Sequence, residues 1–448
     1  MMAALVAAES GADVALLEKD TSVPCNSELA GALVAAAGTR QQKAAGINDS
    51  PELFAKDIAG YTQNQANPEV TLALCRGSAG VLEFLETRVG LSFGLSSGEG
   101  SGDPSSDLWL RSDMWGHAAP RYHRLPTAGG REVIRALREA VRAHSRVLLM
   151  DRRPLQQLLE KNGAVVGVEA GVVGPAKTSI SCRNVVLASG GFGANRTMTA
   201  KYMPEVALWP YRGALTATGD GILQAMMLGA AVDHMGSYHA MPHLWPLTPG
   251  MPRQIRLLGG IAVNRRGERF IAEDVPTAKF ADAVSKQPET IALEIFDKRI
   301  ADAISARAPF SVGIASGAVR SNDSIVELAR SFGIDGAVVE KQLERYNKAV
   351  AGGGDSFGRL VFEQPLRPPY YGGVTTLAFA DSKGGLRVNT KAEVLRADGT
   401  AIRGLYAAGD AAVGIAGERG CAGYLGGNGL LSAFGLGAIA GRQSAQRT

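Results

Sequence analysis

The chain has 448 residues, of which 46% are hydrophobic and 20% are charged, and this composition is typical of a globular protein with two or three domains. Its 47 basic and 43 acidic residues nearly balance and form no basic block, so nucleic acid is not an expected partner. The four cysteines are scattered without metal-binding spacing, which favours a cytoplasmic protein with no bound metal. The chain also lacks an apolar run of about 20 residues, so we expect a soluble protein with no transmembrane segment.

The predicted elements start with a helix over residues 1–10, a turn, and a short buried strand over residues 14–17. A strand without alternating polarity that follows a helix is typical of a parallel sheet covered on both faces. Such a sheet requires a preceding strand, and the sequence starts after it. Further along the chain, helices are predicted over residues 68–89 and 131–144, and strands over residues 146–150, 156–160, 165–170, 185–188 and 404–408.

A change in residue composition indicates an inserted domain. Residues 251–356 are more charged than their surroundings, contain a helix-rich run over residues 324–351, and end in a glycine-rich linker. The glycine-rich, apolar composition of the first part of the chain then returns at Tyr370. We therefore predict an α/β protein in which residues 1–250 and 357–448 form one discontinuous domain that carries the insertion.

An acidic residue, Glu18, ends the strand over residues 14–17 and is followed by Lys19. In dinucleotide-binding folds, an acid at the end of the second strand accepts two hydrogen bonds from the hydroxyl groups of a ribose. A solvated acid at a strand end would give the same pattern. Glu18 is therefore a candidate for binding the adenosine half of a dinucleotide.

A second signal is the strand over residues 185–188, which runs directly into Ser189, Gly190 and Gly191. Such a junction lets the backbone pass close to a cofactor at the carboxyl edge of a sheet. A plain glycine turn between a strand and a helix is the alternative interpretation.

A third signal combines the strand over residues 404–408, which leads to Gly409 and Asp410, with a glycine-rich loop and a helix that continues to Gly441. Asp410 can hold a ribityl hydroxyl group. The loop contains Gly427 and aims free backbone N–H groups at a negatively polarised ligand atom. For a flavin, that atom would belong to the N1–C2=O edge.

Almost the whole chain resembles the FAD-binding flavoproteins related to fumarate reductase, succinate dehydrogenase and the 3-ketosteroid dehydrogenases. The resemblance rests on the order of the three signals and on further blocks between them, at residues 26–27, 218–221, 259–270 and 384–389. It implies a Rossmann-like FAD domain, an inserted α+β capping domain, and hydride transfer between flavin N5 and a carbon of a small-molecule substrate.

The resemblance also implies which residues hold FAD. They lie at strand ends and glycine turns, and they are Glu18, Lys19, Asn26, Ser27, Ala188, Ser189, Gly190, Gly191, Asp220, Gly409, Asp410, Gly427, Asn428, Leu430 and Leu431. Relatives that bind FAD covalently carry a histidine just after the block at Asn26. Residues 28–32 contain no histidine, so noncovalent FAD is expected.

The beginning of the chain departs from the family pattern. The family opens with a strand, a GxGxxG loop, and a helix whose amino terminus carries the FAD pyrophosphate. Met1 falls inside the predicted helix, so that strand and loop are absent from this chain. We expect the native protein to start upstream of Met1.

The substrate residues also depart from the dicarboxylate-reducing members, which use two histidines and two arginines. At those places this chain has Met241, Thr277 with Lys279 nearby, Asp381 and Tyr424. Only Lys279 could hold a carboxylate, so the resemblance is nearer to the 3-ketosteroid dehydrogenases. In those enzymes a tyrosine like Tyr424 donates to the substrate ketone, although Asn428 stands where they have glycine. A core tyrosine with a satisfied hydroxyl group is the alternative.

Two aromatic clusters supply further candidates. In residues 236–245, Tyr238 or His239 could take a proton from the carbon next to the ketone, although each could also be structural. Residues 121–124, preceded by Trp109 and Trp115, form either a lid over the site or a solvated loop.

The sequence therefore predicts an FAD-dependent dehydrogenase or reductase that acts on a C–C bond next to a ketone, in a 3-ketosteroid-like or other cyclic enone. The alternative is a fumarate-reductase-like reduction of an unsaturated carboxylate, with Lys279 and neighbouring arginines as the groups that hold the anion. A rival from another class is a non-catalytic remnant that cannot keep FAD. The sequence leaves open the exact substrate, the direction of reaction, and the electron donor or acceptor.

Overall fold

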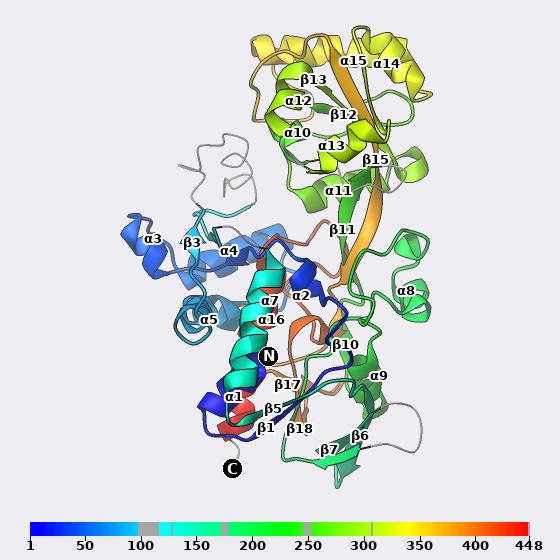
Figure 1. Cartoon of the computed structure of the whole chain (residues 1–448). Coiled ribbons are helices and arrows are strands. Elements are labelled where there is room, and N and C mark those ends of the chain that lie inside the picture. The colour runs from blue at the N-terminus through cyan, green and yellow to red at the C-terminus, as the bar shows by residue number, and fades with distance from the viewer. Residues whose placement is uncertain (97–115, 127–128, 172–177, 245–251, 306–307, 447–448) are drawn as a thin grey trace. The chain divides into compact units, whose positions relative to one another are not determined.

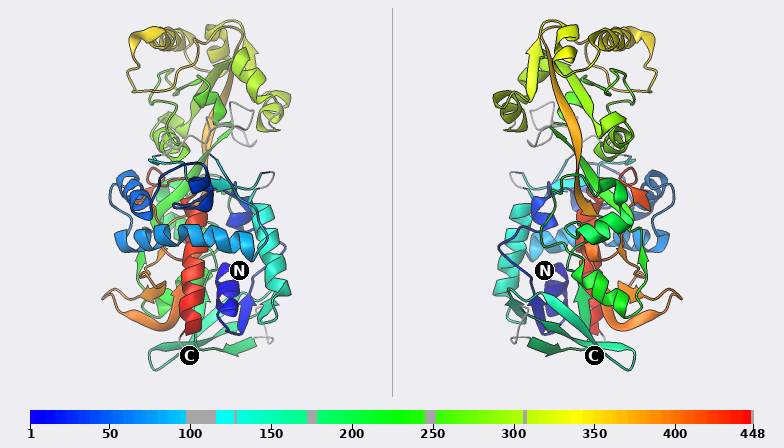
Figure 2. Two further views of the ribbon diagram at one scale, coloured as in Figure 1. Left: turned by 90° about the vertical axis from the view of Figure 1, so that its left-hand side faces the viewer. Right: turned by 90° about the vertical axis from the view of Figure 1, so that its right-hand side faces the viewer.

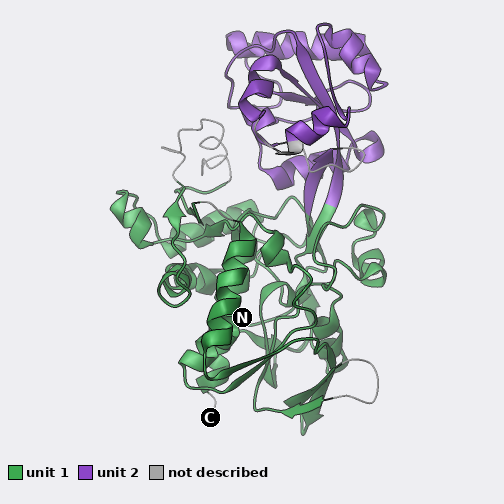
Figure 3. Cartoon of the chain, in the orientation of Figure 1, with its two compact units in different colours: residues 1–96, 116–239, 379–448 green, residues 97–115, 240–378 purple. Residues whose placement is uncertain are grey.

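The computed structural model describes residues 1–96, 116–126, 129–171, 178–244, 252–305 and 308–446 (Figure 1). They form two compact units, coloured green and purple in Figure 3. Unit 1 comprises residues 1–96, 116–239 and 379–448, and the described part of unit 2 lies within residues 240–378. Trp109 and Trp115 lie outside the described residues.

Unit 2 extends beyond both limits of the insertion predicted over residues 251–356. Two long strands, β11 (Gly236–Leu244) and β15 (Tyr370–Ser382), carry the chain from one unit into the other, and the unit limits fall inside them. Residue composition changes at loops and helices, but it does not mark the point at which a continuous strand passes between units.

The helices predicted in unit 1 are confirmed as α1 (Met2–Glu9), α5 (Pro68–Thr87) and α7 (Gly130–Ala143). Their ends follow from local chemistry; for example, the side chain of Asn67 accepts hydrogen bonds from the first N–H groups of α5. The other helices and helical turns of unit 1 are α2 (Asn26–Leu29), α3 (Arg40–Ala44), α4 (Pro51–Tyr61), α8 (Arg196–Tyr202), η2 (Pro204–Val206), α9 (Asp220–Met227), η5 (Gly409–Ala411) and α16 (Asn428–Gln446).

The predicted strands are also present, each within three residues of its expected limits. They are β1 (Val14–Leu17), β5 (Val147–Met150), β6 (Leu155–Lys161), β7 (Ala164–Ala170), β9 (Val185–Leu187) and β18 (Ala401–Ala407). The other strands of unit 1 are β2 (Val34–Ala35), β3 (Gly94–Leu95), β4 (Tyr122–Arg124), β8 (Thr178–Ser181), β10 (Val232–Asp233), β16 (Gly385–Leu386), β17 (Glu393–Leu395) and β19 (Arg419–Gly420). The largest sheet that lies wholly in this unit has the order β17-β18-β7-β6, with β9 on β18 and β8 on β7.

Strand β1 corrects one expectation. It pairs with β5 in parallel, Val14 opposite Val147, as the sequence predicts. The prediction that β1 is buried on both faces is wrong. Ala15 is exposed and Leu148 on β5 is 63% exposed, whereas Leu16 packs into the core with residues of α1 and α7. Successive side chains of a strand alternate between faces, and these helices cover one face. The strand and GxGxxG loop expected before Met1 concern chain outside this sequence, and they stay a prediction.

Helix α16 runs beside α1 and α5, and Figure 2 shows it along the length of unit 1. Leu430 and Phe434 of α16 share a core with Leu5 of α1 and Val81 of α5. The packing of these side chains fixes the first turn of α16, which is the end that carries the glycine-rich loop.

Unit 2 is built on an antiparallel arrangement of β12 (Ile261–Val263), β13 (Ala292–Asp297) and β14 (Val319–Asn322) with β15. Its helices and helical turns are α10 (Gln254–Leu257), α11 (Thr277–Ser285), η3 (Pro288–Thr290), α12 (Lys298–Ile304), α13 (Ala308–Ala315), α14 (Ile325–Ser331), α15 (Gly336–Lys348) and η4 (Ala349–Gly353). Every residue of β13 is buried. Across the described ranges, no helix is both long and apolar enough to cross a bilayer.

Candidate active site

Two parallel strands end side by side at the candidate site. Leu187 of β9 lies opposite Ala407 of β18, so the loops that follow both strands leave the sheet at the same edge. Gly191 lies so close to its neighbours that a Cβ atom there would collide with Ser382 Oγ, and the N–H of the next residue donates to that oxygen over 3.1 Å. The close approach explains why glycine stands at this junction.

Asn26 and Asp410, predicted from separate blocks 384 residues apart, meet at this edge. The side-chain Nδ2 of Asn26 donates to Asp410 Oδ2 over 3.3 Å, and its Oδ1 accepts from the N–H of Ala214 over 2.7 Å. Asn26 therefore holds the Asp410 carboxylate on one side.

Lys383, which none of the sequence motifs predicted, holds the same carboxylate on the other side. Its side chain is 6% exposed, and its Nζ lies 2.6 Å from Asp381 Oδ1 and 3.4 Å from Asp410 Oδ1. Burial alone would lower the pKa of Lys383, but the two carboxylates raise it well above its ordinary value. Lys383 therefore stays charged and cannot act as a base at neutral pH.

The two carboxylates respond to Lys383 in different ways. Burial raises the pKa of Asp381, but Lys383 and His239 outweigh it and lower that pKa to about 2. Burial dominates at Asp410 and raises its pKa, with Lys383 acting against the shift. Asp381 is therefore the firmly ionised member of the cluster.

Tyr424 packs against this charged cluster. Lys383 Nζ lies 4.9 Å from the centre of the Tyr424 ring, and the rings of Tyr424 and His239 have centres 4.5 Å apart. A Cβ atom placed on Gly429 would lie 3.0 Å from the Tyr424 hydroxyl oxygen and 3.3 Å from Lys383 Nζ, so both polar groups reach the first turn of α16. Burial raises the pKa of Tyr424, so its hydroxyl group keeps its proton.

The structure separates the two candidates for a proton acceptor. His239 contacts Tyr424, and its Nδ1 lies 3.6 Å from Asp381 Oδ2. Tyr238 is the preceding residue of β11 and is buried in an aromatic group with Trp209 and Phe379. Because neighbouring residues of a strand point to opposite faces, only one of the two can face Tyr424, and the geometry favours His239.

The first turn of α16 contains buried polar groups without partners. Asn428 is 1% exposed, and neither its amide oxygen nor its amide nitrogen has a hydrogen-bond partner in the structure. The Ser432 hydroxyl group, one turn further on, is also buried without a partner. Buried polar groups in native proteins are normally satisfied, so this end of the helix is suited to a polar ligand.

A second group of predicted residues lies at the end of β1. Lys19 Nζ donates to Thr218 Oγ1 over 2.6 Å and to Asp220 Oδ2 over 2.8 Å, while the Glu18 carboxylate accepts from the N–H of Asp20 over 3.2 Å. A Cβ atom on the residue after Asp220 would lie 2.5 Å from Ser189 Oγ. The loop after β9 thus adjoins the second group.

The remaining candidates are placed as follows. Ala188 and Ser189 are exposed, Ser27 is half-buried, and Leu430 and Leu431 are buried in the first turn of α16. Lys279 is exposed on α11 of unit 2, which starts at Thr277. No group of three or more His, Cys, Asp or Glu side chains among the described residues could hold a metal ion.

These groups fit the FAD that the sequence analysis expects. The unpartnered amide of Asn428 and the first N–H groups of α16 match the polar edge of a flavin, and the Asp410 carboxylate suits a hydroxyl group of its chain. The Glu18 carboxylate at the end of a parallel strand suits a ribose.

Comparison with known proteins gives consistent matches. The family model described as "FAD binding domain" matches residues 1–430. The fumarate reductase (cytochrome) of Shewanella frigidimarina is 31% identical to this chain, over 99% of this chain and 75% of that protein. The 3-oxosteroid 1-dehydrogenase of Mycobacterium tuberculosis is 32% identical over 53% of this chain and 48% of that protein.

A solved structure gives a further match. The 3-ketosteroid-delta4-(5alpha)-dehydrogenase from Rhodococcus jostii RHA1, in complex with 4-androstene-3,17-dione, has a TM-score of 0.80 and 26% sequence identity. The match covers 100% of this chain and 94% of that one. The mixed α/β fold is therefore that of FAD-dependent oxidoreductases.

Proposed function

The chain belongs to the FAD-binding domain family, together with fumarate reductases and 3-ketosteroid dehydrogenases, and from this premise we propose that it oxidises or reduces a C–C bond next to a ketone. The substrate class that we propose is a 3-ketosteroid-like or other cyclic enone. The observation that carries the proposal is the position of Tyr424, beside the first turn of α16 and against His239 and Lys383.

Each side chain has a proposed role. Tyr424 keeps its proton and donates a hydrogen bond to the substrate ketone, whose oxygen gains negative charge during the reaction. His239 exchanges a proton with the carbon next to the ketone. FAD, when bound, supplies the hydride acceptor or donor. The proposed mode of FAD binding is noncovalent, since residues 28–32 contain no histidine.

The charges of the cluster disfavour the alternative, an unsaturated carboxylate. Asp381 stays ionised, and the Lys383 ammonium group is already paired with Asp381 and Asp410. A carboxylate substrate placed beside this cluster would meet the like charge of Asp381, and the cation of the cluster, Lys383, is already paired. Reduction of a carboxylate would therefore depend on Lys279 and neighbouring arginines, and Lys279 is exposed on unit 2.

Two substitutions test the proposal on FAD-loaded protein, with a panel of enones and unsaturated acids. We expect Tyr424→Phe to lower the rate of flavin reduction or reoxidation by roughly 10²–10³, as for the loss of one oxyanion donor, with a much smaller change in substrate binding. Lys279→Met should leave the reaction with enones nearly unchanged.

Other results of these experiments would support the alternative functions. A silent Tyr424→Phe together with loss of unsaturated-acid binding in Lys279→Met would favour the reduction of a carboxylate. If the protein binds FAD stably and no member of the panel reacts with it, the chain is a flavoprotein without the proposed activity.

A further inference from the structure

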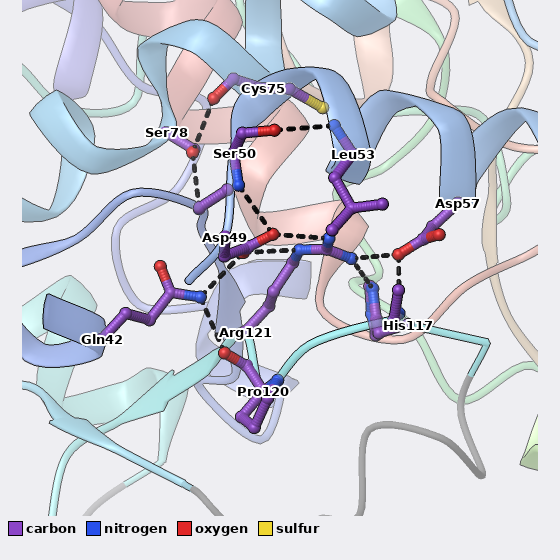
Figure 4. A network of polar contacts seen from close by, with 12 residues as sticks. Gln42, Asp49, Ser50, Leu53, Asp57, Cys75, Ser78, His117, Pro120 and Arg121 are labelled. Carbon is purple, nitrogen blue, oxygen red and sulfur yellow. Dashed lines mark hydrogen bonds and ion pairs between the residues drawn. The ribbon is translucent and has the colours of Figure 1, made fainter. Parts of the chain in front are cut away.

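Residues 121–124, which the sequence assigns to a lid or a solvated loop, form neither. Arg121 is 0% exposed and Tyr122 is 1% exposed, and β4 pairs with both β2 and β3. Arg121 donates two hydrogen bonds to Asp49, from Nη2 over 2.7 Å and from Nε over 2.8 Å, and its Nη1 donates to Asp57. Figure 4 shows the guanidinium group between these two carboxylates. A buried arginine with two carboxylates is a rigid anchor.

A chain of hydrogen bonds leads from this anchor to Tyr122, and its donors and acceptors have a fixed order. Arg121 Nη1 lies 3.2 Å from His117 Nδ1, and since a guanidinium group can only donate, this nitrogen of His117 must accept. The proton of neutral His117 is then on Nε2, which lies 3.1 Å from the Tyr122 hydroxyl oxygen. Burial, with the charge of Arg121, lowers the pKa of His117 to about 3, so the ring stays neutral and its tautomer is fixed.

Tyr122 connects this network to the glycine-rich loop before α16. Gly427 has a φ of +81°, and a Cβ atom on it would lie 2.8 Å from Cε1 of the Tyr122 ring. The Tyr122 ring therefore lies directly against the turn. The next residue is Asn428, the buried amide without a partner that begins α16.

We propose that Asp49, Asp57, Arg121, His117 and Tyr122, the Arg121 network, position the cofactor end of α16. The anchor fixes His117, His117 fixes the Tyr122 ring, and the ring holds the turn at Gly427 so that the Asn428 amide meets the flavin in one orientation. Tyr122 is thus a positioning residue rather than a catalytic one. The inference rests on the proposed function only in placing the flavin at α16.

The test measures FAD binding and the visible circular dichroism of the bound flavin, which reports the asymmetry of its surroundings. Tyr122→Phe keeps the ring and removes the hydroxyl group that holds it, and we expect it to weaken FAD binding by several-fold, up to roughly tenfold. Tyr122→Leu removes the ring, and we expect a larger loss and an altered dichroism spectrum.

A buried arginine of unit 2 provides the matched control. Arg256 is 1% exposed and donates to Glu294 over 2.9 Å, so Arg256→Met breaks a comparable pair that is not part of the Arg121 network. We expect it to lower the unfolding temperature and to leave the flavin spectrum unchanged.

The inference is overturned if Tyr122→Phe and Tyr122→Leu lower only the unfolding temperature, with FAD affinity and dichroism as in the unchanged protein. Because the Phe variant keeps the packing, it should fold even if the Leu variant does not. Neither readout needs a substrate, so a wrong assignment of the ketone would not affect this result.

Discussion

The Lys383 ammonium group lies between two largely buried carboxylates, those of Asp381 (14% exposed) and Asp410 (20% exposed). Buried charges are tolerated when they are paired, and removing one partner leaves an uncompensated charge. The low pKa of Asp381 therefore depends on Lys383, with a further contribution from His239. This dependence makes the cluster testable through the pH dependence of stability.

We predict that Lys383→Met destabilises the protein by about 3–5 kcal/mol at neutral pH. Asp381 has a folded pKa below its ordinary 3.8, so its pairing stabilises the protein above pH 3.8, and that stabilisation is lost as the pH falls toward 2. Without Lys383, only His239 still opposes the effect of burial on this pKa, so the pKa rises and the variant loses stability relative to the unchanged protein as the pH rises. Urea unfolding of both proteins from pH 4 to 8 should show a gap that widens with pH.

An exposed lysine serves as the control for this prediction. Lys286 is 69% exposed and pairs with Asp282, so Lys286→Met should change stability by less than about 1 kcal/mol at every pH. If the gap between Lys383→Met and the unchanged protein stays constant with pH, the coupling of Lys383 to the two carboxylates is contradicted.

Part of this cluster could have been predicted from the sequence. Asp381 and Lys383 are two residues apart where a strand ends before two glycines, and residues at that spacing share a face. The third member, Asp410, lies on another strand end, and only the folded chain brings it to Lys383. The choice between Tyr238 and His239 also needed the fold. Successive side chains of a strand lie on opposite faces, but the sequence does not show which face is turned toward Tyr424.

At the scale of single elements, the sequence predicts well what depends on local pattern. The limits of β1, α5 and α7 follow from periodicity, and the Asn67 side chain also caps the start of α5. The burial of β1 could not be predicted in this way, because it depends on which helices cover each face. The role of Arg121 was missed for the same reason, since its partners Asp49 and Asp57 are more than 60 residues away.

The turn at Gly427 gives a prediction for the element that begins α16. Gly427→Ala should cost about 1–2 kcal/mol for the left-handed backbone and about 1–3 kcal/mol more because the Tyr122 ring must move. Denaturant unfolding measures this cost. We also expect weaker FAD binding, because the turn precedes Asn428.

Gly399 separates the two contributions. Its φ is +83°, and a Cβ atom on it would meet no atom within 4 Å, so Gly399→Ala carries the backbone cost alone. Equal losses of stability in the two variants, with FAD binding unchanged in both, would show that the Tyr122 contact contributes nothing.

At the scale of the whole molecule, unit 1 is built from separated segments of the chain. The sequence analysis predicts a discontinuous domain from the return of a glycine-rich, apolar composition at Tyr370, although the structure places Tyr370 itself in unit 2. All residues expected to hold FAD belong to unit 1, from Glu18 to Leu431, whereas Lys279 belongs to unit 2. This division has a measurable consequence, because a ligand stabilises the part of a protein that binds it.

Hydrogen exchange measured by mass spectrometry should detect that consequence. At an FAD concentration of 100 times Kd, binding stabilises the unit that holds FAD by about 2.7 kcal/mol, so amides that exchange through its unfolding should slow by about 100-fold. We expect this protection in peptides from β9, β18 and α16 of unit 1. Peptides from β13 of unit 2, which is fully buried, should exchange at the same rate with and without FAD. Equal protection of β13 and α16 would mean that the units unfold together or that FAD is held by both, and the assignment of the cofactor to unit 1 alone would then be wrong.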